Sequence, residues 1–98
     1  MPLLPETAIR EALSAMPGWI LENGALKRRY LFESYMRGIQ FVEAAAVEAE
    51  AQDHHPDLLV RYGDVTASCS THSHGGVTGK DLHLARALDR IAAQYGGR

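Results

Sequence analysis

The first third of the chain changes from a helical to an alternating pattern of apolar residues. Apolar positions over residues 5–15 recur at helical intervals, which predicts a helix that ends before Pro17. Residues 19–21 and 26–32 favour two strands instead. Asn23-Gly24 between them predicts a hairpin, because both residues tolerate the positive φ angles of a tight turn.

The same order of helix and hairpin is predicted again in the middle of the chain. Ser34 is a suitable N-cap for a long helix that reaches about Ala51. Pro56 cannot extend that helix, and the residues after it alternate in polarity on both sides of Gly63-Asp64, which predicts a second hairpin. The apolar stripe expected on the long helix consists of Ile39, Val42, Ala46 and Ala49.

A third helix is predicted near the C-terminus. Thr78 and Asp81 have the spacing of a capping box, with Asp in place of the usual Glu, and Gly96-Gly97 ends the apolar periodicity. The resulting order, α-β-β-α-β-β-α, is typical of an α+β sandwich in which three helices cover a four-stranded antiparallel sheet. At 98 residues, we expect a single domain over residues 1–98.

Composition narrows the possible functions. A formal charge of −2 argues against a nucleic-acid-binding surface, and a single cysteine cannot form an internal disulfide or a thiolate zinc cluster. No apolar run approaches the ~20 residues of a membrane span, and residues 1–5 lack the pattern of a secretory signal, so we expect a cytoplasmic protein. Because 14 of its apolar residues are alanine, we expect a thin core and a homo-oligomer.

Four of the five histidines lie between residues 54 and 74. His54 and His55 come just before the third predicted strand, and His72 is predicted to end the fourth. Because His55 is eight residues before Gly63 and His72 is eight after Asp64, the hairpin should bring the three imidazoles to one end of the sheet.

Imidazoles gathered in this way are suited to proton transfer near neutral pH, and a nearby carboxylate can fix their tautomers. Such a set could remove water from carbon with one acid and one base. Two other interpretations remain open: the histidines could be exposed residues that cap the helix, or three of them could bind a metal ion. We expect Cys69 to be a core residue, Trp19 to lie in the core or in a pocket wall, and His74 and His83 to be solvated.

The spacing of these residues resembles that of the pterin-4a-carbinolamine dehydratase family. The resemblance runs from about Trp19 to Ile91. Its motif consists of Glu50, His54-His55-Pro56, Tyr62, His72 and Asp81. It implies a lyase that converts 4a-hydroxytetrahydrobiopterin into quinonoid dihydropterin and water, as part of tetrahydrobiopterin recycling.

The resemblance also implies a role for each residue of the site. His54 and His72 would act as acid and base, His55 would hold and polarise the pterin, and Glu50 would orient a histidine or a ring nitrogen. Asp81 belongs to the motif but could equally serve as the helix cap. The residues expected to contact the substrate are Asp53, Pro56, Ser70, Thr71, Ser73 and Asp81.

The family further implies no metal or organic cofactor, a homodimer or homotetramer, and a link to an aromatic amino-acid hydroxylase. No nucleic acid or membrane partner is expected. Leu58 stands where many relatives carry tryptophan, so one aromatic wall of the pocket should be missing. The alternative function is a non-catalytic oligomerisation or binding module on the same fold, similar to the dimerisation cofactor known in this family. Such a module has no physical need for three converging histidines.

Overall fold

The computed structural model describes residues 2–98, so Met1, the first residue of the stretch considered for a secretory signal, lies outside the described residues. The elements follow the predicted order, with one short 3-10 helix, η1, added before the last helix. Their bounds are α1 Glu6–Leu13, β1 Ile20–Glu22, β2 Ala25–Leu31, α2 Tyr35–Gln52, β3 Asp57–Val60, β4 Asp64–Cys69, η1 His72–His74 and α3 Gly79–Gln94. The four strands form one antiparallel sheet in the order β1-β2-β4-β3, which confirms the predicted fold class.

The hairpin between β1 and β2 forms as its local sequence predicts. Glu22 pairs with Ala25, so only Asn23 and Gly24 lie in the turn. Their φ angles are 51° and 74°, both in the left-handed region that a two-residue hairpin of this kind needs. This turn also fixes where β2 begins, and it therefore limits how far β4 can pair beside it.

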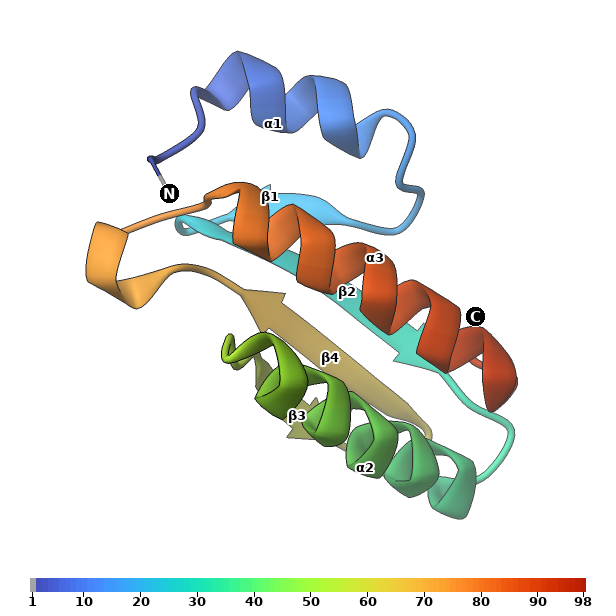
Figure 1. Cartoon of the computed structure of the whole chain (residues 1–98). Coiled ribbons are helices and arrows are strands. Elements are labelled where there is room, and N and C mark those ends of the chain that lie inside the picture. The colour runs from blue at the N-terminus through green and yellow to red at the C-terminus, as the bar shows by residue number, and fades with distance from the viewer. Residues whose placement is uncertain (1) are drawn as a thin grey trace.

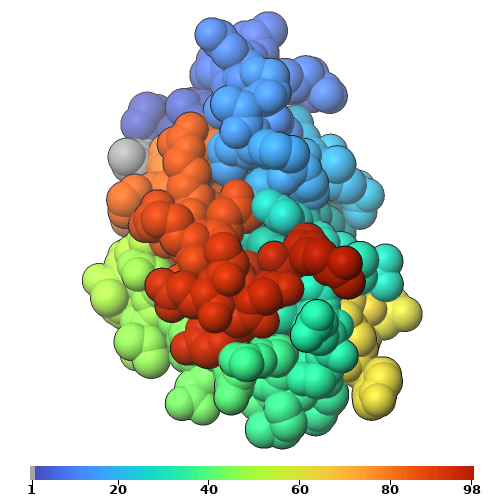
Figure 2. All heavy atoms as spheres, turned by 90° about the vertical axis from the view of Figure 1, so that its right-hand side faces the viewer, coloured from blue at the N-terminus to red at the C-terminus, as the bar shows by residue number. Residues whose placement is uncertain are grey.

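The helices form a layer on one face of the sheet. Figure 1 shows α2 and α3 side by side across that face, with α1 beyond α3. Figure 2 shows the same arrangement from the side, where α3 in red and orange lies between α1 in blue and α2 in green. Among residues 2–98, no helix combines the length and the apolar composition that crossing a membrane requires.

The core lies between the helices and the inner face of the sheet. It is built around Tyr30, Phe41, Leu84 and Leu88, and Trp19 and Cys69 are also buried in it. The prediction for Cys69 is therefore confirmed, and Trp19 is a core residue rather than a pocket wall. The fourth strand alternates as expected, with Val65, Ala67 and Cys69 facing inward.

The prediction of the buried face of α2 was partly wrong. Gly38, Phe41, Ala45 and Ala49 are buried, whereas Ala46 is exposed. Gly38 faces the sheet, where an added Cβ would be in ordinary van der Waals contact with a Val65 methyl group at 3.5 Å and the Phe32 ring at 3.6 Å. The helix therefore turns this side toward the sheet, and Phe41 and Ala45 follow it at i+3 and i+7.

Candidate functional site

The candidate site lies at the end of the sheet where α2 stops and β3 begins. Asp53 closes α2 in the left-handed conformation, with φ 50° and ψ 42°. Its N–H donates to Glu50 O at 3.2 Å, and the His54 N–H donates to Ala49 O at 3.1 Å. An aspartate tolerates this conformation better than most residues, at a cost of roughly 1 kcal/mol. The tight closure holds His54 and His55 against the end of the sheet.

His72 reaches the same end from a different element than predicted. It begins η1, whereas the sequence analysis placed it at the end of the fourth strand. The pairing of Leu26 with Cys69 would put Thr71 beside Gly24, which is already in the hairpin turn, so β4 has no partner strand there. Thr71 instead pairs with Gly76, and its N–H donates to Gly76 O at 2.7 Å. The chain between them therefore leaves the sheet as a compact loop that carries His72.

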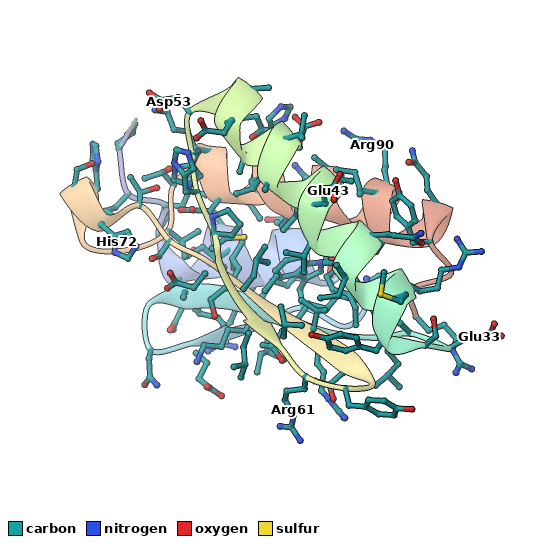
Figure 3. The ribbon with its side chains drawn as sticks, turned by 90° about the horizontal axis from the view of Figure 1, so that it is seen from below. Glu33, Glu43, Asp53, Arg61, His72 and Arg90 are labelled. Atoms are coloured by element: carbon teal, nitrogen blue, oxygen red, sulfur yellow. The ribbon has the colours of Figure 1, made fainter. Side chains whose placement is uncertain are left out.

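Figure 3 shows Asp53 and His72 at one end of the molecule, with Glu33 and Arg61 away from that end. A cavity of about 270 Å³ lies at this end. It is enclosed by the closing turn of α2, the residues that directly follow β4, and the first turn of α3. This volume lies close to the lower limit of about 300 Å³ for small-molecule sites. Its lining consists of Asp53, His54, His55, Ser70, Thr71, His72, Ser73 and Lys80.

Seven of the ten predicted site residues therefore lie around one cavity. Glu50 and Asp81 are not in its lining, but each contacts a histidine that is. Pro56 is partly buried and does not line the cavity. Leu58 also lies outside it and packs against the core, so the aromatic wall that was expected to be missing at this position does not belong to this cavity.

His54 is held by a buried carboxylate. Its Nε2 lies 2.5 Å from Asp81 Oδ1, and Asp81 is fully buried at 0% exposure. The other oxygen, Asp81 Oδ2, accepts from the Thr71 hydroxyl and from the Thr78 N–H, both at 2.8 Å. A carboxylate with three donors is well suited to bind the Nε2–H tautomer of His54, which leaves Nδ1 as the ring nitrogen free for another partner.

The predicted capping box of α3 is also confirmed, and it belongs to the same network. Thr78 Oγ1 accepts from the Lys80 N–H at 3.2 Å, while Asp81 caps the Thr78 N–H. The Thr71 and Thr78 hydroxyls lie 2.9 Å apart; since Thr71 donates to Asp81, Thr78 donates to Thr71. Asp81 therefore caps a helix and contacts a histidine at once, which confirms its interpretation as a helix cap, whereas its expected contact with the substrate stays a prediction.

The second histidine has an exposed carboxylate partner. His55 Nε2 contacts Glu50 Oε2 across the closing turn of α2, and both side chains are more than half exposed. Water competes with such a pair, so it fixes the ring less firmly than Asp81 fixes His54. His72 is exposed, and among residues 2–98 its ring has no hydrogen-bond partner.

Cys69 precedes Ser70 of the cavity lining but is not available as a nucleophile. Burial raises the pKa of its thiol to about 12, and the negative charges of Asp81, Asp89 and Asp57 raise it further in the same direction. At neutral pH the residue is a protonated thiol packed in the core.

The other titratable residues do not form a competing centre. His74 and His83 are exposed and lie outside the cavity lining, as predicted. Within residues 2–98, no group of three or more His, Cys, Asp or Glu side chains is arranged to hold a metal ion. A larger groove of about 500 Å³ between α2 and α3 contains two carboxylates, Glu43 and Glu48, but no histidine.

The sequence analysis missed Lys80, which completes the cavity lining. Lys80 follows Gly79 in the first turn of α3. Cations are disfavoured at helix N-termini because the helix dipole is positive there. A lysine directly before the aspartate of a capping box was therefore the signal that could have identified it.

Comparisons with known proteins match the chain over nearly its whole length. A protein-family model described as "Pterin 4 alpha carbinolamine dehydratase" matches residues 2–91. A relative from Mycobacteroides abscessus named "Putative pterin-4-alpha-carbinolamine dehydratase" is 45% identical over 89 residues, which are 91% of this chain and 95% of the relative. A relative of the same name from Sulfolobus acidocaldarius is 41% identical over 90% of this chain and 97% of its own.

Two solved structures share the fold. A crystal structure of a transcriptional coactivator/pterin dehydratase from Brucella melitensis is 36% identical, with a TM-score of 0.86 over 92% of this chain and 98% of that chain. A pterin dehydratase-like protein described as a RuBisCO assembly factor in the alpha-carboxysome is 20% identical, with a TM-score of 0.64 over 76% of this chain and 86% of that chain, and shows a likeness of fold alone. Given the family match over residues 2–91, this chain belongs to the pterin-4a-carbinolamine dehydratase family.

Proposed function

We propose that this protein is a 4a-hydroxytetrahydrobiopterin dehydratase that supports tetrahydrobiopterin recycling. The observation that carries the proposal is one cavity lined by three histidines, of which two have carboxylate partners.

In the reaction, the bond between C4a and its hydroxyl oxygen breaks, and that oxygen leaves as water with a proton from an acid. A base takes a proton from a ring N–H, and the electron pair left behind forms the new double bond at C4a.

His54 and His72 are the acid and base of this proposal. Asp81 accepts the Nε2–H of His54, so Nδ1 is the nitrogen that exchanges a proton with the substrate. The buried Asp81 carboxylate stabilises the imidazolium that forms when His54 takes up a proton. His72 has an exposed ring with no hydrogen-bond partner within residues 2–98, and it can approach the pterin from the side of η1.

The remaining residues bind and orient. His55, held by Glu50, polarises the pterin ring. Asp53, Ser70 and Ser73 contact the polar edges of the substrate from the cavity wall. The hydroxyl of Thr71 already donates to Asp81, so Thr71 acts as a positioning residue for the pair of His54 and Asp81.

The test is the catalysed loss of a chemically generated 4a-hydroxytetrahydropterin. We expect His54→Ala and His72→Ala each to lower kcat/KM by about 10²–10⁴-fold, the usual contribution of a general acid or base. His83→Ala is the matched control, because His83 is exposed on α3 and outside the cavity, and it should retain full activity. No acceleration over buffer by the unaltered protein, or full rates in both cavity variants, would overturn the proposal.

The cellular setting is part of the same proposal. The substrate is the product of an aromatic amino-acid hydroxylase. The protein acts in the cytoplasm and forms a homodimer or homotetramer. The exposed Val47 and the groove between α2 and α3 support self-association, because acidic Glu43 and Glu48 of one copy can face basic Arg86 and Arg90 of another. Light scattering should give a mass of two or four chains, and a monomer at micromolar concentration would overturn this part.

A further inference from the structure

The segment that carries His72 has few connections to the rest of the molecule. We call residues 71–76 the His72 loop. Within residues 2–98, every hydrogen bond of the four residues between its two ends stays inside this loop. The position of His72 therefore depends on the two residues at the base of the loop, Thr71 and Gly76.

The two ends of the loop are held in different ways. Thr71 is fixed by its hydroxyl, which donates to the buried Asp81. Gly76 pairs with Thr71 across the base, where the Thr71 N–H donates to Gly76 O at 2.7 Å. Two consecutive glycines, Gly75 and Gly76, precede the buried Val77, and glycine leaves the backbone more freedom than any other residue. A further contact therefore matters most at the Gly76 end.

Leu3 and Leu4 supply that contact from the segment before α1. The Leu4 N–H donates to Val77 O at 2.9 Å, and Leu3 forms a bridge with Thr78. The Leu3 side chain lies over Gly76, since a Cβ added to this glycine would be 3.1 Å from Leu3 Cδ2. Figure 1 shows this segment beside the stretch that joins η1 to α3.

The local sequence keeps the segment extended and attached to the core. Leu4 precedes Pro5, and a proline disfavours the helical conformation for the residue before it. Pro5 is itself extended, with φ −65° and ψ 150°, and caps α1. That helix is anchored by the buried Ile9. Leu3 and Leu4 are therefore presented to their partners in a conformation that costs little entropy to reach.

We propose that Leu3 and Leu4, which we call the strap, are positioning residues that hold the His72 loop in place for catalysis. The inference rests on the proposed dehydratase function and deepens it, because it names what positions the exposed histidine. One backbone hydrogen bond and the half-exposed Leu3 attach the strap, so it can detach while the core stays folded. Loss of one such bond should shift the equilibrium between the held and the released loop by about threefold to tenfold.

Amide hydrogen exchange tests the strap without any reaction. Leu4→Pro removes the N–H donor of the strap. In this variant we expect the Thr71 amide, which donates to Gly76 O, to exchange about threefold to tenfold faster than in the unaltered protein. The His54 amide, which donates to Ala49 O at the end of α2, should exchange at its original rate. Unchanged exchange at Thr71 would overturn the proposal.

Kinetics test whether the strap acts through His72. Leu4→Pro should lower kcat/KM by about threefold to fivefold, because a smaller fraction of the protein holds the loop in place. In a His72→Ala background the same change should cost less than about 1.5-fold, since the ring that the strap positions is then absent. An equal loss in both backgrounds would overturn the action through His72.

Leu13→Ala is the matched control for the loss of a leucine. Leu13 also packs against the core in a partly buried position, but it belongs to the last turn of α1. This variant should keep full activity and the original exchange at Thr71. Leu3→Gly, which removes the side chain over Gly76, should act in the same direction as Leu4→Pro and replaces it if the proline variant does not fold.

The two readouts separate this inference from the dehydratase proposal. If the unaltered protein did not accelerate dehydration, the dehydratase proposal would fall, and the exchange at Thr71 would still decide whether the strap holds the loop. If the unaltered protein were active and the strap variants changed neither the exchange nor kcat/KM, the strap alone would be refuted.

Discussion

Two aspartates of α3, eight residues apart, accept hydrogen bonds from distant parts of the chain but serve different ends of the molecule. Asp81 lies in the first turn and contacts the candidate site through His54. Asp89 lies near the middle of the helix, and among residues 2–98 its hydrogen-bond partners are Trp19, Arg28 and Tyr30, which hold the helix to the sheet. The same residue type on the same helix therefore contacts a histidine of the candidate site in one place and holds the fold together in the other.

Both carboxylate oxygens of Asp89 are occupied by hydrogen bonds from the scaffold. Its two oxygens accept from Trp19 Nε1 at 3.0 and 3.1 Å, and Oδ1 also accepts from Arg28 at 2.9 Å and from the Tyr30 hydroxyl at 2.6 Å. Burial, reinforced by the hydrogen bond to Asp89, raises the pKa of Tyr30 well above its ordinary value, so the phenol stays protonated. The Arg28 guanidinium lies 4.6 Å from the Tyr30 ring centre and adds a cation–π contact.

The Asp81 network differs in one member. Thr71 and Thr78 are fixed donors like the partners of Asp89, but His54 has a second ring nitrogen and lines the cavity. Asp81 does not line the cavity itself, so it reaches the cavity through lining residues, and of these His54 is the one that can exchange a proton with a substrate. The comparison teaches that the chemistry of the partners, rather than the burial of the carboxylate, separates the site from the scaffold.

The largest expected effect is on catalysis, in Asp81→Asn. The amide can still cap the Thr78 N–H, so the free energy of unfolding should fall by only about 1 kcal/mol. It no longer stabilises the imidazolium of His54 or selects its tautomer, and kcat/KM should fall by about 10²–10⁴-fold with an altered pH profile. Kinetics from pH 6 to 9 with urea unfolding measure both quantities, and a kcat/KM within threefold of the unaltered protein contradicts a role for Asp81 in the site.

Asp89→Ala should have the opposite effect: a large loss of stability and little change in kcat/KM. Three donors lose their acceptor at a partly buried position, so the free energy of unfolding should fall by about 2–4 kcal/mol. At 15 °C, where the variant remains folded, kcat/KM should stay within about threefold. Tyr30→Phe, which removes a single donor, should cost only about 1 kcal/mol. If Asp89→Ala lost activity as Asp81→Asn does while still folded, the two aspartates would not be separable.

The smallest expected effect is on stability at high pH and comes from Cys69. Burial is the main reason that the pKa of its thiol is raised to about 12, and Asp81 and Asp89 raise it further. The thiol should not react with a thiol reagent at pH 8 until the protein unfolds. In the unfolded chain it ionises near pH 9, so the free energy of unfolding should decrease as the pH rises from about 9 toward 12, by about 1.4 kcal/mol at pH 10. Cys69→Ala should show a correspondingly smaller decrease, and rapid labelling of the folded protein at pH 8 would contradict this account.

Much of the architecture was predictable because it depends on neighbours in the chain. The Asn23-Gly24 turn, the Ser34 cap and the capping box of Thr78 and Asp81 each follow from the backbone preferences of a few adjacent residues. Once these were placed, the alternation of apolar residues was sufficient for the α+β order.

Three features could not be predicted from neighbouring residues in the chain. The buried face of α2 depends on which of its residues meet Phe32 and Val65, and the departure of His72 from β4 depends on where a different strand begins. The place of Lys80 in the cavity depends on how the start of α3 meets the end of α2.

Local patterns thus placed the histidines, the helices and the strands along the chain, since a turn or a cap needs only a few consecutive residues. Packing between elements far apart in the chain joined His54 to Asp81, separated Asp81 from Asp89 in role, and brought Lys80 to the cavity. These contacts span up to 70 residues of sequence, and no periodicity within one segment encodes which side chain of another segment it will meet.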